Sequence, residues 1–347
     1  MGLRVAILWS ELSGYADACF RALAAHPGCD GLFLSHFRAD PMAPFDASAF
    51  AWLEQRAFYD ELMASGTLIR TVEAFRPDVV LVTSWHIRGY RAALRALAGK
   101  AVRVLCMDNQ WLGTPKQRLG VAVSRWHVRP LYDRVFLPGE RQAIFARRLG
   151  FPQSAIRYGL YACDPARFAP PPGTPPGEGF VFVGRLIPEK GVDVLGAAYR
   201  AYRAAATDPW PLTVYGSGPL KDMLAGIEGV TLAGFVQPDA LPAALHRAGA
   251  FVLPSLFEPW AVAIHEAAAA GLPLIVTAVC GASVHLVQDG LNGAVVGAGD
   301  VDGLARAFGR IAGLTPEARA GAGAMSLALA QQYTPARWAE TVLAMPS

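Results

Sequence analysis

Short, nearly continuous apolar segments alternate with helical patterns along this chain, and this alternation constrains its fold most strongly. Such segments are typical of parallel strands, because helices cover both of their faces. The pattern therefore predicts an α/β protein with two doubly wound, Rossmann-like sheets. The expected strands are residues 3–9, 78–83, 102–107 and 134–137, and then residues 180–183, 212–215, 230–232, 250–253, 274–277 and 293–296.

A proline-rich segment separates the two sets of strands. Residues 169–177 contain five prolines and two glycines, a composition that excludes a helix or a central strand. We therefore expect an N-terminal domain at residues 1–168 and a C-terminal domain at residues 178–332, joined by this linker. The length of 347 residues fits two domains, and a hydrophobic content of 53% supports two sizeable cores.

Charge and cysteine content narrow the partners and the compartment. The formal net charge of +3 argues against a nucleic-acid partner. Residues 1–165 contain 20 Lys and Arg against 14 Asp and Glu, which suits an acidic ligand or an anionic membrane surface. The five cysteines form no CxxC pair, the first residues read as a strand, and no apolar run is long enough to span a membrane. These features predict a cytoplasmic protein.

Two acidic residues, Glu258 and Glu266, lie around a predicted strand-to-helix turn. The strand ends at Leu253, and the next helix is expected to begin near Ala261. Free N–H groups at a helix N-terminus bind anions. The two carboxylates therefore suit a ligand with a central phosphate and hydroxyl groups at both ends. Alternatively, they are ordinary acids of a solvated helix start.

Two cations follow the first strand of the second set. Arg185 lies at the end of the strand, and Lys190 is expected at the start of the next helix. A planar guanidinium and a mobile ammonium can together neutralise a diphosphate. The alternative is a solvated loop that carries two cations.

Taken together, these motifs resemble the retaining glycosyltransferases of family 4, which have the GT-B architecture. The resemblance is dense over residues 180–300, whereas the first 165 residues share mainly the strand–helix pattern. It rests on Gly184-Arg185-Leu186, Glu189-Lys190-Gly191, Gly216-Ser217-Gly218-Pro219, Gly234-Phe235, Pro254-Ser255, the E-x7-E spacing of Glu258 and Glu266, Gly271-Leu272-Pro273 and Asp289-Gly290-Leu291-Asn292-Gly293.

The resemblance implies two domains that face a cleft, a last helix at about residues 333–347 that returns to the first domain, and a UDP- or GDP-linked sugar as donor substrate. In this interpretation Arg185 and Lys190 bind the diphosphate, Glu266 the ribose hydroxyls, and Glu258 the hydroxyls of the donor sugar. The other expected donor-binding residues are Gly14, Gly184, Gly216, Phe235, Val236, Trp260, Ala261 and Val262.

No metal and no cofactor are implied. The formal DxD pattern at Asp300 is interpreted as a helix N-cap.

Expected catalytic residues are Glu258, Lys190, Arg185, His86 and Asp108. His86 resembles a family histidine near the donor sugar, or else belongs to a solvated loop. Asp108 stands where the family often has a second histidine. Smaller departures are Ala261 in place of glycine and His285 in place of glutamate. We favour front-face attack, with the departing phosphate as base, over a covalent adduct of Glu258.

The expected activity is a metal-independent hexosyl transfer, of the kind used in polysaccharide biosynthesis. The acceptor is a glycan, a lipid-linked saccharide or a small molecule. Two alternatives stay open, a nucleotide-sugar epimerase and a catalytically silent binding subunit. The basic stretch 116–148 either contacts anionic lipid at the inner face of the membrane or is a solvated basic surface.

Overall fold

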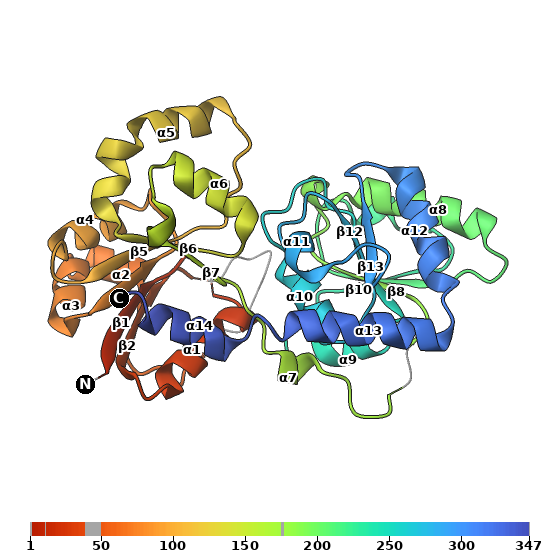
Figure 1. Cartoon of the computed structure of the whole chain (residues 1–347), viewed down its shortest axis with the longest axis horizontal. Coiled ribbons are helices and arrows are strands. Elements are labelled where there is room, and N and C mark those ends of the chain that lie inside the picture. Colours follow the sequence, from red (N-terminus) through yellow and green to blue (C-terminus); the bar gives the residue numbers. More distant parts are fainter. Residues whose placement is uncertain (1, 11, 39–49, 175–176, 347) are drawn as a thin grey trace. The chain divides into compact units, whose positions relative to one another are not determined.

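The computed structural model describes residues 2–10, 12–38, 50–174 and 177–346. The chain forms two compact units, each with its own parallel sheet (Figure 1). Unit 1 comprises the residues up to Ala162 and those from Pro335 onward, and unit 2 comprises Cys163–Thr334.

The described residues of unit 1 form a seven-stranded parallel sheet in the order β3-β2-β1-β4-β5-β6-β7. Three of these strands were not expected. Asp30 and Gly31 interrupt the apolar run of β2, while β3 and β7 are three-residue strands near or at the sheet edges. The strands are β1 (Leu3–Leu8), β2 (Cys29–His36), β3 (Arg56–Phe58), β4 (Val79–Val82), β5 (Val102–Cys106), β6 (Arg134–Leu137) and β7 (Ile156–Tyr158).

Helices cover both faces of this sheet, and the last helix of the chain is one of them. The α14 residue Trp338 donates from Nε1 to the carbonyl of Leu160 at 2.9 Å, and its ring packs 5.9 Å from the ring of Phe20. The helices are α1 (Gly14–Ala25), α2 (Tyr59–Ala64), α3 (Leu68–Phe75), α4 (Arg88–Ala96), α5 (Pro115–His127), α6 (Glu140–Arg148) and α14 (Pro335–Leu343), with 3-10 turns at Arg129–Leu131 and Gln153–Ala155.

The described residues of unit 2 form a six-stranded parallel sheet in the order β10-β9-β8-β11-β12-β13. All six strands coincide with the expected apolar runs. Most of them are buried, and a strand buried on both faces carries a nearly continuous apolar signal, whereas the edge strand β10 is largely exposed. They are β8 (Phe180–Val183), β9 (Leu212–Tyr215), β10 (Val230–Gly234), β11 (Ala250–Leu253), β12 (Leu274–Thr277) and β13 (Gly293–Val296).

Three of the helices described in unit 2 begin at a side-chain cap. Asp300 Oδ1 accepts a hydrogen bond from the N–H of Gly303 at 2.8 Å, as expected for the N-cap of α12. The helices are α7 (Pro165–Phe168), α8 (Val192–Ala205), α9 (Leu241–His246), α10 (Val262–Ala269), α11 (Ser283–Leu286), α12 (Val301–Ala312) and α13 (Pro316–Ala330), with 3-10 turns at Pro188–Lys190 and Lys221–Met223.

The division between the units falls after Ala162, ahead of the proline-rich segment. Residues 163–168, which we expected in the N-terminal domain, pack within unit 2. The N–H of Cys163 donates to His265 Nδ1 at 3.2 Å, and His246 Nε2 bonds the carbonyl of Phe168 at 2.7 Å. Residues 175 and 176 of the expected linker lie outside the described residues.

Candidate functional site

In each unit the strand order reverses between two neighbouring strands, and such a switch point leaves a crevice at the carboxyl ends of those strands. In unit 2 the two strands are β8 and β11, and in unit 1 they are β1 and β4. The loops that follow these four strands therefore hold the candidate sites. They contain Arg185 and Glu258 in unit 2, and His86 in unit 1.

The loops after β8 and β11 are joined through their backbones. The carbonyl of Glu189 accepts hydrogen bonds from the N–H groups of Leu256 at 2.8 Å and Phe257 at 3.2 Å. Gly191 has a φ of 64°, and a Cβ at this position would overlap the carbonyl oxygen of Pro254. Only glycine therefore allows this approach.

This contact places Lys190 beside Glu258, 68 residues further along the chain. Lys190 Nζ forms an ion pair with Glu258 Oε2, and the two side chains are 17% and 10% exposed. Charges this far removed from water require an oppositely charged partner. Lys190 itself lies in the 3-10 turn Pro188–Lys190 and not at the start of α8, which begins at Val192.

The loop that carries Glu258 is also tied to the loop after β12. The Glu258 carbonyl accepts from the N–H of Gly281 at 3.1 Å, and the Trp260 carbonyl accepts from the N–H of Ala282 at 2.9 Å. A Cβ at Gly281 would overlap the carbonyl oxygen of Pro259. The Glu258 backbone is thus held from two sides.

Arg185 follows β8 as an exposed cation. It forms no ion pair or hydrogen bond with any residue that the structure describes, so its guanidinium can bind a ligand. The adjacent Gly184 contacts the loop after β9, where Gly216 has a φ of 148° and a Cβ would overlap the Gly184 carbonyl oxygen. The missing side chain at Gly216 therefore lets the loops after β8 and β9 touch.

Glu266 lies in α10, and its carboxylate forms no hydrogen bond or ion pair within the described part of the chain. Burial raises the pKa of Glu266 to about 7, while the charge of Arg167 acts in the opposite direction. A half-buried carboxylate without a partner among the described residues can accept hydrogen bonds from a ligand.

The start of α10 has a strained backbone. Ala261, the N-cap residue, has a φ of 76°, one of two positive φ values among the described non-glycine residues. The first N–H groups of a helix have no partner within it. An alanine in this conformation, at the free end of a helix near two carboxylates, is typical of a functional turn.

The neighbouring expected residues differ in exposure. Trp260 is only 2% exposed, and its ring packs 5.6 Å from that of His285 and 6.4 Å from that of Tyr333. The Trp260 side chain therefore belongs to the core below the turn. A ligand at this turn would contact the backbone of Val262 and its neighbours. Phe235, which follows the edge strand β10, is 38% exposed.

In unit 1, His86 and Asp108 line one pocket of about 340 Å³. The Oγ of Ser84 lies 2.9 Å from His86 Nδ1, and Asp108 Oδ2 accepts a hydrogen bond from the hydroxyl of Tyr161 at 3.1 Å. The pocket is rich in hydroxyl, carboxyl and amide groups. Gly14, expected near the phosphates, is the first residue of α1 and does not line this pocket.

The structure adds residues that sequence reasoning missed. Ser10 and Thr83 also line the pocket of unit 1, and the N–H of Ser10 donates to Thr83 Oγ1 at 2.9 Å. Both follow strands that meet at the switch point, so the position of Ser10 after β1 could have identified it. No signal in the sequence identified Tyr161, which reaches Asp108 from 53 residues away.

The described residues offer neither a metal site nor a membrane-spanning helix. No group of three or more His, Cys, Asp or Glu residues in the described ranges could hold a metal ion. None of the helices there is long and apolar enough to cross a membrane.

Comparisons with known proteins agree with this geometry. Residues 177–313 match the family model described as Glycosyl transferases group 1. This segment belongs to the group 1 glycosyltransferases. The matched segment contains the Lys190–Glu258 pair, Arg185 and Glu266, so the candidate site of unit 2 lies inside the group 1 region.

Two curated relatives extend the similarity. The chain is 31% identical to glycogen synthase of Mycobacterium tuberculosis over 259 residues, which are 68% of this chain and 60% of that protein. It is 34% identical to D-inositol 3-phosphate glycosyltransferase of Mycobacterium avium over 187 residues, which are 50% of this chain and 42% of that one. The chain thus spans less than two thirds of the length of these relatives.

Two solved structures share the fold of nearly the whole chain. HepE of Anabaena, solved with UDP and glucose, matches with a TM-score of 0.72 and 16% identity, over 96% of this chain and 97% of that one. Sucrose-phosphate synthase of Thermosynechococcus elongatus matches with a TM-score of 0.69 and 17% identity, over 97% and 96% of the two chains. The fold of this chain is therefore GT-B, as expected.

Proposed function

We propose that this chain is a retaining, metal-independent glycosyltransferase of the family 4 type, which takes a sugar from a UDP- or GDP-linked donor. The observation that carries the proposal is the Lys190–Glu258 ion pair, placed at the switch point of unit 2 next to the available guanidinium of Arg185. The unpartnered carboxylate of Glu266 lies in the helix that follows. These groups suit the phosphates, the sugar and the ribose of one ligand.

The reaction breaks the bond between the anomeric carbon and the diphosphate oxygen. Negative charge then develops on the leaving diphosphate, where Lys190, Arg185 and the free N–H groups of α10 stabilise it. Because these groups are already oriented in the folded chain, they need little rearrangement during the reaction. No metal ion is required in this scheme.

Glu258 binds hydroxyl groups of the donor sugar in this proposal. Its carboxylate is already paired with Lys190, which makes it a weaker nucleophile and favours a hydrogen-bonding role over a covalent one. The acceptor hydroxyl then attacks from the face that the diphosphate leaves. Its proton passes to the departing phosphate oxygen, and the anomeric configuration is retained.

We place sugar hydroxyl groups of donor or acceptor in the polar pocket of unit 1. His86, Asp108, Ser10 and Thr83 supply donors and acceptors there, and Tyr161 positions the Asp108 carboxylate. Glycogen synthase and D-inositol 3-phosphate glycosyltransferase, the relatives above, have polyhydroxyl acceptors by name. A glycan, a lipid-linked saccharide or a small polyol suits this pocket.

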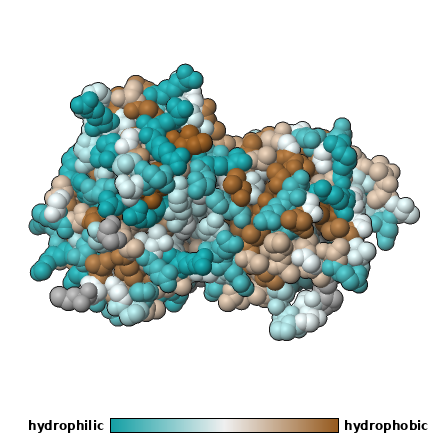
Figure 2. Space-filling view, viewed as in Figure 1, coloured by the Kyte–Doolittle hydropathy of each residue, from teal (hydrophilic) through white to brown (hydrophobic). Residues whose placement is uncertain are grey.

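A lipid-linked acceptor is favoured by the surface of α5. This helix has no acidic residue, and of its residues only Ser124 is buried. Leu119 and Trp126, 66% and 65% exposed, are seven residues apart and so lie on one helix face. Lys116 and Arg125 flank them, and Figure 2 shows hydrophilic and apolar side chains mixed in this region. Such a surface suits an anionic membrane at the cytoplasmic side.

Vesicle sedimentation tests the membrane contact. Wild type should bind vesicles of anionic phospholipid and not those of neutral phosphatidylcholine, and Trp126→Ser with Leu119→Ser should reduce the binding at least tenfold. Binding that is equal on the two vesicle types would refute the contact without touching the proposed reaction.

Calorimetric titration with UDP and GDP, followed by assays with their sugar conjugates, tests the proposed function. Wild type should bind one nucleotide tightly, and Glu266→Ala should weaken this binding at least tenfold through loss of the ribose contacts. The product of transfer should have the anomeric configuration of the donor. Neither the family model nor the named relatives favour the epimerase, which would convert donor without acceptor. A silent binding subunit would bind nucleotide but neither transfer nor hydrolyse.

A further inference from the structure

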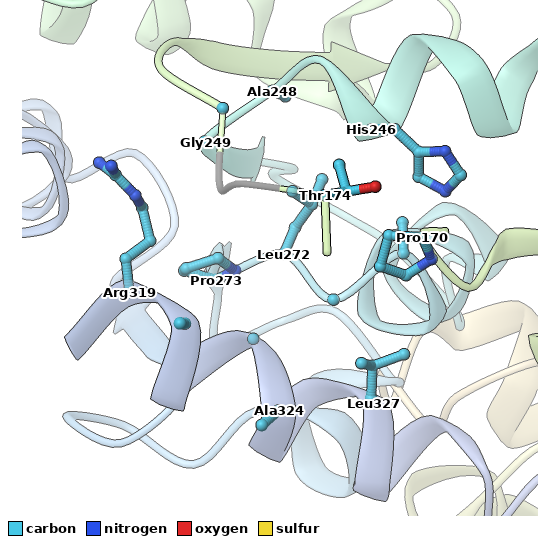
Figure 3. Close-up of a pocket in the computed structure, with 15 residues that line it drawn as sticks. Pro170, Thr174, His246, Ala248, Gly249, Leu272, Pro273, Arg319, Ala324 and Leu327 are labelled. Carbon is cyan, nitrogen blue, oxygen red and sulfur yellow. The ribbon is translucent and has the colours of Figure 1, made fainter. Parts of the chain in front are cut away.

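A second pocket in unit 2 lies at the amino ends of the strands, whereas the residues of the candidate site follow their carboxyl ends. Its volume is about 200 Å³ (Figure 3). Gly249 precedes β11, and Leu272 and Pro273 precede β12, so this pocket is on the opposite sheet edge from Glu258. One face of α13, Thr174 of the proline-rich segment and His246 at the end of α9 also line it, and the His246 ring is already bonded to the carbonyl of Phe168.

The pocket contains a buried cation without a counterion. Arg319 projects from α13 at one side of the pocket (Figure 3) and is only 5% exposed. Its Nε makes no hydrogen bond, and no carboxylate pairs with it among the residues that the structure describes. Burial of an unpaired guanidinium is costly, so a chain that keeps one next to a cavity leaves room for an anion.

The guanidinium is held in a fixed position by an aromatic ring. It stacks 4.8 Å from the ring centroid of Trp210, which is 8% exposed. The backbone of Trp210 is anchored in turn. Its amide N–H donates to the hydroxyl of Tyr202 at 2.9 Å, and its carbonyl accepts from the hydroxyl of Tyr199 at 2.8 Å. Stacking on an aromatic face partly offsets the burial of the cation and leaves its N–H groups free to bind.

The remaining lining is mostly apolar. Leu272, Pro273, Leu327 and Pro170 provide hydrocarbon surface, and the Thr174 hydroxyl already donates to the carbonyl of Pro171 at 2.7 Å. Pockets for drug-sized ligands have volumes of about 300–1,000 Å³, so this smaller space suits a compact molecule.

We propose that this pocket binds a small organic acid, whose carboxylate pairs with Arg319 and whose apolar body packs against Leu272, Pro273 and Leu327. The charged end and the apolar end of such a ligand each match one part of the lining. This site does not depend on the proposed glycosyl transfer, since it uses none of the residues assigned to that reaction.

Calorimetric titration of the full chain with sodium benzoate, hexanoate and inorganic phosphate tests the site. At least one of the two organic acids should bind in a 1:1 ratio, whereas benzamide, an uncharged analogue of benzoate, should not. Arg319→Met keeps the side-chain length, removes the charge and should weaken this binding at least tenfold. Arg306→Met, which removes an exposed arginine of α12 outside the pocket, should leave it unchanged.

A second variant and a stability measurement separate binding from folding. Ala324→Phe, at a pocket position that is exposed, should block the organic acids while Arg319 stays in place. Without added acid, Arg319→Met should unfold at the same temperature as wild type or higher, because the unpaired buried charge is gone. Equal affinity in wild type and Arg319→Met would overturn the proposal. No binding of either organic acid to wild type up to about 10 mM, or binding of phosphate alone, would overturn it too.

Discussion

The Lys190–Glu258 ion pair allows a quantitative test of how the site of unit 2 is held together. The side chains of Lys190 and Glu258 are only 17% and 10% exposed. When one of them is replaced by a neutral residue, the other is left as an unpaired charge with little access to water. Removal of one partner of such a pair costs about 3–5 kcal/mol, and the residual exposure favours the lower value. Lys190→Met or Glu258→Gln should therefore lower the free energy of unfolding by about 3 kcal/mol. For a unit of this size the corresponding fall in Tm is roughly 6–12 °C.

The double variant makes the reasoning falsifiable. Lys190→Met with Glu258→Gln leaves no buried charge, so most of the stability should return, with a coupling energy of about 2 kcal/mol or more between the two changes. Thermal unfolding of the intact chain by circular dichroism measures all four proteins. The exposed pair Lys100–Glu73, with 63% and 38% exposure, is the matched control and should give a coupling below about 1 kcal/mol.

Activity separates the two roles of Lys190. The double variant should regain stability but not turnover, because the leaving diphosphate still lacks its cation. Loss of one such stabilising group lowers kcat by about 10²–10³-fold. Strictly additive effects of the two substitutions on stability, each below about 1 kcal/mol, would refute the assignment of a buried, interacting pair.

Three further predictions concern the carboxylate of Glu266 and the backbone at Gly191 and Ala261. Burial raises the pKa of Glu266 from 4.5 to about 7, so the folded chain binds a proton more tightly than the unfolded chain, and stability falls as the pH rises through this range. Glu266→Gln should therefore have a free energy of unfolding about 3 kcal/mol higher than that of wild type at pH 8, and equal to it at pH 4. Urea unfolding at both pH values measures this difference. If the stabilities of the two proteins change with pH in parallel, the prediction is wrong. Gly191→Ala should abolish nucleotide binding in calorimetry, because its Cβ would displace Pro254 and the Glu258 loop. Gly226→Ala is the control, since Gly226 has a similar φ of 73° and open space around it. It should lower the free energy of unfolding by only about 1–2 kcal/mol and leave the nucleotide affinity unchanged. Ala261→Gly should raise the free energy of unfolding by up to about 1 kcal/mol, because glycine adopts the φ of 76° without strain. Ala263→Gly inside the helix should instead lower it by about 0.5–1 kcal/mol. A loss of stability in both variants would argue against strain at Ala261.

Much of the fold was predictable from the sequence, because strands buried on both faces carry a continuous apolar signal. Most strands of unit 2 and β1, β4, β5 and β6 of unit 1 are such runs, whereas the exposed edge strand β10 was found from its short apolar run alone. The strands that escaped prediction lack this signal. The start of β2 contains Asp30 and Gly31, while β3 and β7 are short and near or at a sheet edge, where tertiary pairing decides the conformation.

The candidate residues were also predictable as types and positions. Arg185, Glu258 and His86 each follow a buried strand, and parallel strands bring their carboxyl ends to one edge of a sheet. Their partners were not predictable in this way. That Lys190 pairs with Glu258 depends on the contact of Gly191 with Pro254, which joins segments more than 60 residues apart.

The sequence by itself therefore determined the elements, their order and the residues that end each strand, since these depend on local periodicity and composition. Only the tertiary structure decided which charges are paired and which are left alone. Lys190 has a counterion and Arg319 has none among the described residues, yet both are simply basic residues in the sequence. The physical reason is that burial and charge pairing depend on distances between segments that no local pattern encodes.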